Sequence, residues 1–102
     1  MIFAEITYPE RYEEKHGDLC SLLKRSFSHV ESGLQSDSWI WIHFGEQKVA
    51  VDTFTSMTHQ VKSPRPGRHV DDVIAVLQEQ FTVRVYEKPE WEAHEDPSGD
   101  PA

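Results

Sequence analysis

A chain of 102 residues is long enough for one hydrophobic core and too short for two. Its formal net charge of −8 and the absence of a basic stripe argue against a nucleic-acid-binding protein. No apolar run approaches the roughly 20 residues of a membrane-spanning helix, and residues 1–10 do not resemble a signal peptide. Because Cys20 is the only cysteine, no internal disulfide can form, and we expect a cytoplasmic protein.

The negative charge is concentrated towards the C-terminal end. Residues 87–102 carry six acidic residues and one lysine, whereas residues 1–86 carry twelve acidic and nine basic residues. Residues 89–102 are rich in Pro, Glu, Asp, Gly and Ser, and they cannot bury enough apolar surface to offset the entropy of ordering them. We therefore predict one domain over residues 1–88 and a disordered acidic tail over residues 89–102.

The first predicted element is a strand over residues 1–8, where the side chains alternate in character. Apolar residues then recur at helical spacing between residues 10 and 31. Gly17 interrupts this pattern, which favours a helix that starts at Asp18 as its N-cap. Gly33 is the expected stop just past the end of this helix.

The second half of the chain is predicted to contain four strands and one helix. Three strands come first, at residues 39–44, 47–54 and 57–62, and Gly45-Glu46 turns the first into the second. A loop rich in Pro and Gly then leads to a helix at residues 69–80 and a last strand at residues 81–87.

The predicted order of elements is therefore β-α-β-β-β-α-β. Two helices, each flanked by strands, favour an α+β two-layer sandwich in which one mostly antiparallel sheet carries both helices on one face. This order resembles the ferredoxin-like plan with an added hairpin strand. Because that plan serves many unrelated functions, the resemblance implies a fold and no activity.

The first hairpin determines which side chains share a face of the sheet. If residues 45–46 form a two-residue turn, the isoleucines of the strand at residues 39–44 face the helices. Trp39, Trp41 and His43 then lie on the opposite face, which the helices leave uncovered. A slip of one residue would exchange the two faces, so this assignment depends on the turn.

A second turn, at residues 55–56, would pair Asp52 with His59 and place both residues beside Trp39. The apolar patch on this open face would be larger than the few hundred Å² that monomers usually expose, and Trp is enriched at interfaces. The predicted partner-binding residues are therefore Trp39, Trp41, His43, Asp52 and His59. In the alternative interpretation the chain covers this face itself, with Trp91 and the tail folded back over it.

An Asp52–His59 pair also raises a catalytic hypothesis, because a carboxylate orients and stabilises a histidine. However, no spacing marks a nucleophile nearby, and we predict no catalytic residues. The six histidines show no local two-histidine spacing and Cys20 stands alone, so neither a metal nor another cofactor is predicted.

A small basic loop precedes the second predicted helix and contains Lys62, Arg65 and Arg68. Basic side chains beside a helix N-terminus can hold an anion, so these residues form a candidate anion site. Asp71 and Asp72 fall in the first turn of the same helix, where they would repel an anion.

Three functions remain open at this point. The first is a small, acidic, non-enzymatic module that self-associates or binds a partner protein through the open sheet face, as acidic inhibitor or immunity-type proteins present acids and aromatics to a basic partner. The second is a regulatory domain that binds a small metabolite at the sheet face or at the basic loop. The third is a small enzyme that uses Asp52 and His59. We expect no nucleic-acid or membrane partner.

Overall fold

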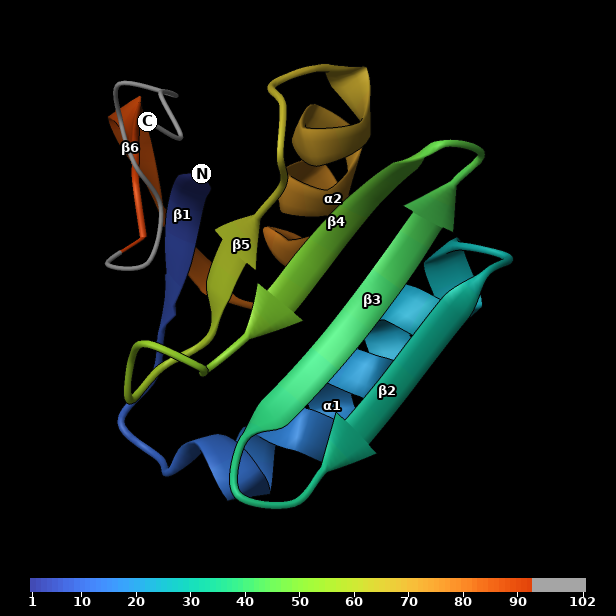
Figure 1. Cartoon of the computed structure of the whole chain (residues 1–102). Coiled ribbons are helices and arrows are strands. Elements are labelled where there is room, and N and C mark those ends of the chain that lie inside the picture. Colours follow the sequence, from blue (N-terminus) through green and yellow to red (C-terminus); the bar gives the residue numbers. More distant parts are fainter. Residues whose placement is uncertain (93–102) are drawn as a thin grey trace.

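The computed structural model describes residues 1–92, which form a six-stranded sheet with two helices on one of its faces (Figure 1). The strand order is β2-β3-β4-β5-β1-β6, and every neighbouring pair is antiparallel. The predicted α+β two-layer fold is therefore confirmed. In chain order the elements are β1 (Ile2–Thr7), α1 (Tyr12–Ser26), β2 (Val30–Leu34), β3 (Ser38–Phe44), β4 (Gln47–Asp52), β5 (Gln60–Lys62), α2 (Arg68–Leu77) and β6 (Thr82–Glu90).

The first helix starts earlier than predicted. It begins at Tyr12, where the backbone N–H of Arg11 donates a hydrogen bond to the carboxylate of Glu14 (3.1 Å). Gly17 and Asp18 lie on its exposed side, so the helix continues through them. A glycine inside a helix costs about 1 kcal/mol. The burial of three leucines in the following turns, at positions Leu19, Leu22 and Leu23, offsets this cost.

β2 is a strand where the sequence predicted the end of the first helix, so the true order is β-α-β-β-β-β-α-β. α1 ends at Ser26, and the extended backbone of Phe27 turns the chain into the sheet. Gly33, the expected helix stop, pairs with Trp39 across β2 and β3. The apolar spacing up to Val30 agreed with a helix by chance, because Val30 also faces inwards from a strand.

The core lies between the sheet and the two helices, and the first hairpin has the predicted register. Ile40 pairs with Val51 and Ile42 with Val49, and all four side chains are fully buried. Gly45 has a φ of 62°, which glycine adopts readily in a tight turn. The assignment of the two faces of β3 and β4 is therefore confirmed.

The connection after β4 differs from the prediction, and the difference moves His59. β4 ends at Asp52, which pairs with Gln60 and not with His59. A shift of one residue exchanges the two faces of a strand, so Val61 enters the core and Lys62 turns towards the open face. The predicted Asp52–His59 neighbour pair is wrong.

β6 continues beyond the predicted end of the domain. It runs to Glu90 as an edge strand, where Pro89 is tolerated because no further strand needs its missing N–H. The predicted tail from residue 89 therefore contributes to the sheet at its start, and residues 93–102 lie outside the described part. In residues 1–92, neither helix has the length and apolar character that a membrane crossing requires.

Candidate functional site

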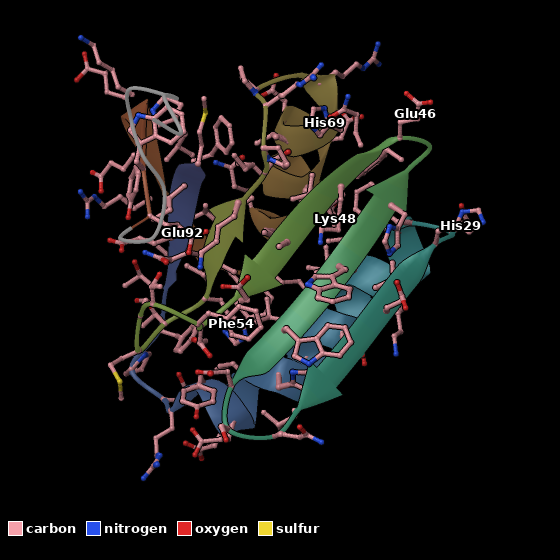
Figure 2. All side chains as sticks on the ribbon, viewed as in Figure 1. His29, Glu46, Lys48, Phe54, His69 and Glu92 are labelled. Atoms are coloured by element: carbon pink, nitrogen blue, oxygen red, sulfur yellow. The ribbon has the colours of Figure 1, made fainter. Side chains whose placement is uncertain are left out.

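The candidate site is the sheet face that the helices leave uncovered. β3 places Trp39, Trp41 and His43 on this face, directly across from residues of β4. Figure 2 shows Lys48 and Phe54 on the near side of the sheet, with the helices behind it. His43 Nε2 lies 2.5 Å from a carboxylate oxygen of Glu31 on the neighbouring strand.

Two indole rings form the centre of this face. Trp39 and Trp41 are partly exposed, and their ring centroids lie 4.4 Å apart. The Nζ atom of Lys48 lies 4.3 Å from the centroid of Trp41, within the range of a cation–π interaction. A Cβ atom built on Gly33 would come within 2.5 Å of the Trp39 ring. The rings are thus held in place by contacts to β2 and β4.

Replacing Gly33 with Ala is expected to displace the Trp39 indole, because the added Cβ would overlap its ring atoms. We expect the near-UV circular dichroism of the Trp39–Trp41 pair to change while the domain loses about 1 kcal/mol of stability or less. Gly17→Ala is the control, since a Cβ there meets nothing within 4 Å. An unchanged aromatic spectrum in Gly33→Ala would contradict this packing.

A buried ion-pair cluster lies beside the aromatic rings. Lys62 Nζ lies 2.6 Å from Asp52 Oδ1 and 2.7 Å from Glu92 Oε2, and the three side chains are only 5%, 4% and 11% exposed. Glu92 follows β6, so the chain returns from the sheet edge to its middle (Figure 2). The chain therefore covers part of this face itself, but it leaves Trp39 and Trp41 partly exposed.

Two small recesses open on this face. One, of about 200 Å³, is lined by Gln35, Ser36, Asp37, Trp39 and Phe54. The other, of about 220 Å³, contains the ion-pair cluster and is lined by Met1, Lys48, Ala50, Asp52, Lys62, Ser63, Pro64 and Glu92. Both are smaller than the roughly 300–1,000 Å³ of typical small-molecule pockets.

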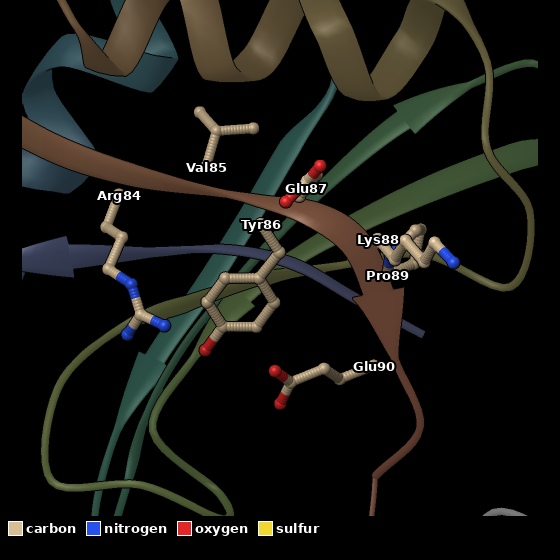
Figure 3. Close-up of a pocket in the computed structure, with 7 residues that line it drawn as sticks. All are labelled: Arg84, Val85, Tyr86, Glu87, Lys88, Pro89 and Glu90. Atoms are coloured by element: carbon tan, nitrogen blue, oxygen red, sulfur yellow. The ribbon is translucent and has the colours of Figure 1, made fainter.

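A larger recess, of about 620 Å³, follows β6 alone (Figure 3). Arg84, Tyr86 and Glu90 point to one side of the strand there. Arg84 donates a hydrogen bond to Glu5 (2.6 Å), and burial together with the Glu5 carboxylate raises the pKa of Tyr86. Because all the lining residues belong to one strand, polar groups from different elements do not converge there as in most ligand sites.

A chain of hydrogen bonds runs through the buried side of the sheet, and the sequence patterns did not reveal it. The Tyr8 hydroxyl lies 2.6 Å from His59 Nδ1, and His59 Nε2 lies 2.7 Å from the Ser38 hydroxyl. Ser38 Oγ also lies 2.6 Å from His16 Nδ1, and His16 Nε2 lies 3.3 Å from Cys20 Sγ. Since a neutral imidazole has one donor and one acceptor nitrogen, each group can donate to the next in this order.

This hydrogen-bonded network lies apart from the three recesses described above. Ser38 and His59 are fully buried, and none of the three recesses above is lined by any of its members. Burial lowers the pKa of His59 to about 4, and it also lowers the pKa of His16. These histidines are therefore neutral at pH 7, and they satisfy buried polar groups that would otherwise be costly.

The predicted anion-binding residues lie in different surroundings. Lys62 is buried between two carboxylates, whereas Arg65 and Arg68 are exposed. Arg68 Nε lies 3.9 Å from Asp72, one turn along α2. The anion site stays a prediction, and one of its three cations, Lys62, already forms ion pairs with two carboxylates of the same chain. In the described residues, no three His, Cys, Asp or Glu side chains are grouped to hold a metal ion.

Fold and site together define a two-layer α+β domain with an aromatic, partly charged open sheet face. Comparison with known proteins finds no family model that matches the chain, no similar curated protein and no similar solved structure.

Proposed function

We propose that this chain is a non-enzymatic interaction module that binds a basic partner protein through its open sheet face. The Trp39–Trp41 pair is the observation that supports this proposal most, because two large rings stay partly exposed on the side away from the core. Phe54, which is 49% exposed, adds a third ring on the same face (Figure 2). Aromatic side chains that become buried when a partner binds supply much of the binding energy at protein interfaces.

The net charge favours a basic partner over a second copy of this chain. Residues 1–92 carry fifteen acidic and ten basic residues, and the whole chain has a net charge of −8. A second copy would bring the same excess of negative charge, whereas a basic protein would be attracted and oriented by it. With Cys20 as its only cysteine, the chain is proposed to act in the cytoplasm.

The other two hypotheses have weaker support. A metabolite at the sheet face would enter a recess of only about 220 Å³, in which Asp52 and Glu92 already neutralise Lys62. An enzyme that uses Asp52 and His59 loses its basis, because His59 is buried against Tyr8 and Ser38.

Replacing Trp41 with Lys is expected to weaken partner binding at least about 30-fold, since loss of a hot-spot tryptophan costs about 2 kcal/mol or more. The domain should stay folded, because Trp41 contributes to the open face and not to the core. Proteins retained from a cell extract by the wild-type chain are purified, and their affinity for the wild type and for Trp41→Lys is measured by calorimetry.

Val85→Lys is the matched control, because Val85 is 51% exposed and lies on β6, away from the aromatic rings. We expect it to bind the purified partner as the wild type does. The proposal is overturned if Trp41→Lys binds the partner as tightly as the wild type does. It is also overturned if the wild type retains no partner but forms a dimer that Trp41→Lys dissolves. Unfolding of both Trp41→Lys and Trp39→Thr would show that this face belongs to the core and would overturn it too.

A further inference from the structure

One recess on the open face brings aromatic rings and an acidic side chain together. Its lining includes Trp39, Phe54 and Asp37, and its volume is about 200 Å³. Trp39 belongs to β3, Asp37 to the turn before it, and Phe54 to the connection after β4. Three separate segments thus converge on a space that suits one side chain of a partner better than a whole metabolite.

The turn that carries Asp37 is fixed by several hydrogen bonds. The Tyr12 hydroxyl donates to the carbonyl of Ser36 (2.6 Å), and the backbone N–H of Gln35 donates to the carbonyl of Asp37 (3.1 Å). The Thr53 hydroxyl lies 3.5 Å from Asp37 Oδ1. The turn therefore keeps Asp37 in the lining of the recess before any partner arrives, which lowers the entropic cost of binding.

The chemistry of this recess suits a cation. Ring faces attract cations, and the open face already shows this attraction within the chain, where Lys48 Nζ lies 4.3 Å from the Trp41 centroid. Lys62 Nζ lies 6.0 Å from the Phe54 centroid. A carboxylate beside two rings adds a charge-assisted acceptor for the same cation.

We infer that this recess binds an arginine side chain of the basic partner, an inference that rests on the proposed function. The planar guanidinium stacks on Trp39 or Phe54 and donates hydrogen bonds to the Asp37 carboxylate. Arginine suits this site better than lysine, because its flat, weakly hydrated group stacks on rings and forms paired hydrogen bonds to a carboxylate.

The test uses the blocked peptide Ac-Gly-Gly-Arg-Gly-Gly-NH2 and its twin with citrulline, which has the same shape as arginine without the charge. Each is titrated into the ¹⁵N-labelled chain and followed by NMR. We expect saturable shifts at the Trp39 indole N–H and at the amides of Asp37 and Phe54. The citrulline peptide should bind about fivefold more weakly or worse, since a cation–π contact and an exposed ion pair are both lost.

Asp37→Asn is expected to weaken the arginine peptide by a similar factor, because asparagine keeps the shape and removes the charge. Glu46→Gln is the control, since Glu46 is exposed in the turn at the other end of β3 (Figure 2) and should leave the affinity unchanged. Equal binding of the two peptides, shifts centred elsewhere, or no shift at the Trp39 indole would overturn the inference.

The same variants separate this inference from the proposed function. If Trp41→Lys abolishes binding of the purified partner and Asp37→Asn has no effect, the interaction face stands and the arginine site is wrong. If neither variant affects the partner, the proposed function is wrong, whatever the arginine peptide does.

Discussion

Lowering the pH from 7 to 5 is expected to reduce the free energy of unfolding by about 2 kcal/mol through His59 alone. Burial lowers the pKa of His59 from 6.5 to about 4 in the folded domain. The unfolded chain therefore binds more protons between these two values, and stability falls as the pH falls through this window. The loss through His59 is complete below about pH 4, where it reaches about 3 kcal/mol.

The hydrogen bonds of His59 explain why protonation of its ring destabilises the folded domain. A neutral imidazole accepts one of the hydrogen bonds to Tyr8 and Ser38, whereas a protonated imidazole has two donor nitrogens and no acceptor, so one of these bonds could form only if the hydroxyl changed its role. The nearby His16 adds repulsion when both rings are protonated. The charge itself would be held in a site without exposure to water.

Urea unfolding of the wild type and of His59→Gln, measured at about pH 7, 6 and 5, isolates this contribution. Glutamine can form hydrogen bonds to Tyr8 and Ser38, but it does not titrate. We expect the variant to be less stable than the wild type at pH 7, and to lose about 2 kcal/mol less than the wild type when the pH is lowered to 5. His16 is present in both proteins, so its own protonation contributes to both losses. Equal losses in the two proteins, or an NMR titration of His59 with a midpoint near 6.5, would contradict the prediction.

Replacing Lys62 with Met is expected to cost about 3–5 kcal/mol, because removing one member of a buried ion pair leaves the other charge unpaired. Here the loss would leave both Asp52 and Glu92 without the ammonium group that they share. This cost is a large fraction of the roughly 5–15 kcal/mol that stabilises a typical domain. Urea unfolding at pH 7 measures it.

Lys48→Met is the matched control, since it removes a lysine from the same face where its charge is partly exposed. We expect it to cost about 1 kcal/mol or less. Adding Asp52→Asn to Lys62→Met should raise the free energy of unfolding by about 1 kcal/mol or more, because it removes the buried negative charge that has lost its lysine. Asparagine can still accept the hydrogen bond from the backbone N–H of Phe54 (3.2 Å). If Lys62→Met costs no more than Lys48→Met, water screens the cluster and the argument fails.

The first hairpin could be predicted because its turn is short and well defined. A two-residue turn at Gly45 placed Ile40 and Ile42 opposite the valines of β4 on the face towards the helices, and the structure has that register. The tryptophan pair on the open face followed directly from it. Local patterns with a well-defined turn therefore carry enough information to orient a strand.

The second hairpin could not be predicted because its connection is not a tight turn. Seven residues separate Asp52 from Gln60, and β5 has only three residues to show an alternation. The register was decided by tertiary contacts, among them the hydrogen bond from the backbone N–H of Ile6 to the carbonyl of His59 (2.8 Å). As a result, His59 became a core residue, and Lys62 lies on the open face opposite Ala50.

β2 and the buried polar chain were missed for a related reason. Val30 and Gly33 fit a helix and its stop equally well in the sequence, and only the pairing with β3 makes this segment a strand. Ser38 and His59 lie more than twenty residues from each other and from Tyr8 and His16, so no spacing marks the four as neighbours. Signals of this kind exist only after distant segments have packed.

The position of β1 has a consequence for how this domain is made. β1 lies between β5 and β6, and Ile2 pairs with Lys62 on one side and with Glu90 on the other. On the ribosome, β2, β3 and β4 can pair as soon as they emerge, since they are neighbours in the chain. β1 leaves the exit tunnel before both of its partners, which are synthesised more than fifty residues later. Its apolar residues lack their final partners during that delay, and this is the stage at which the chain is most prone to aggregation.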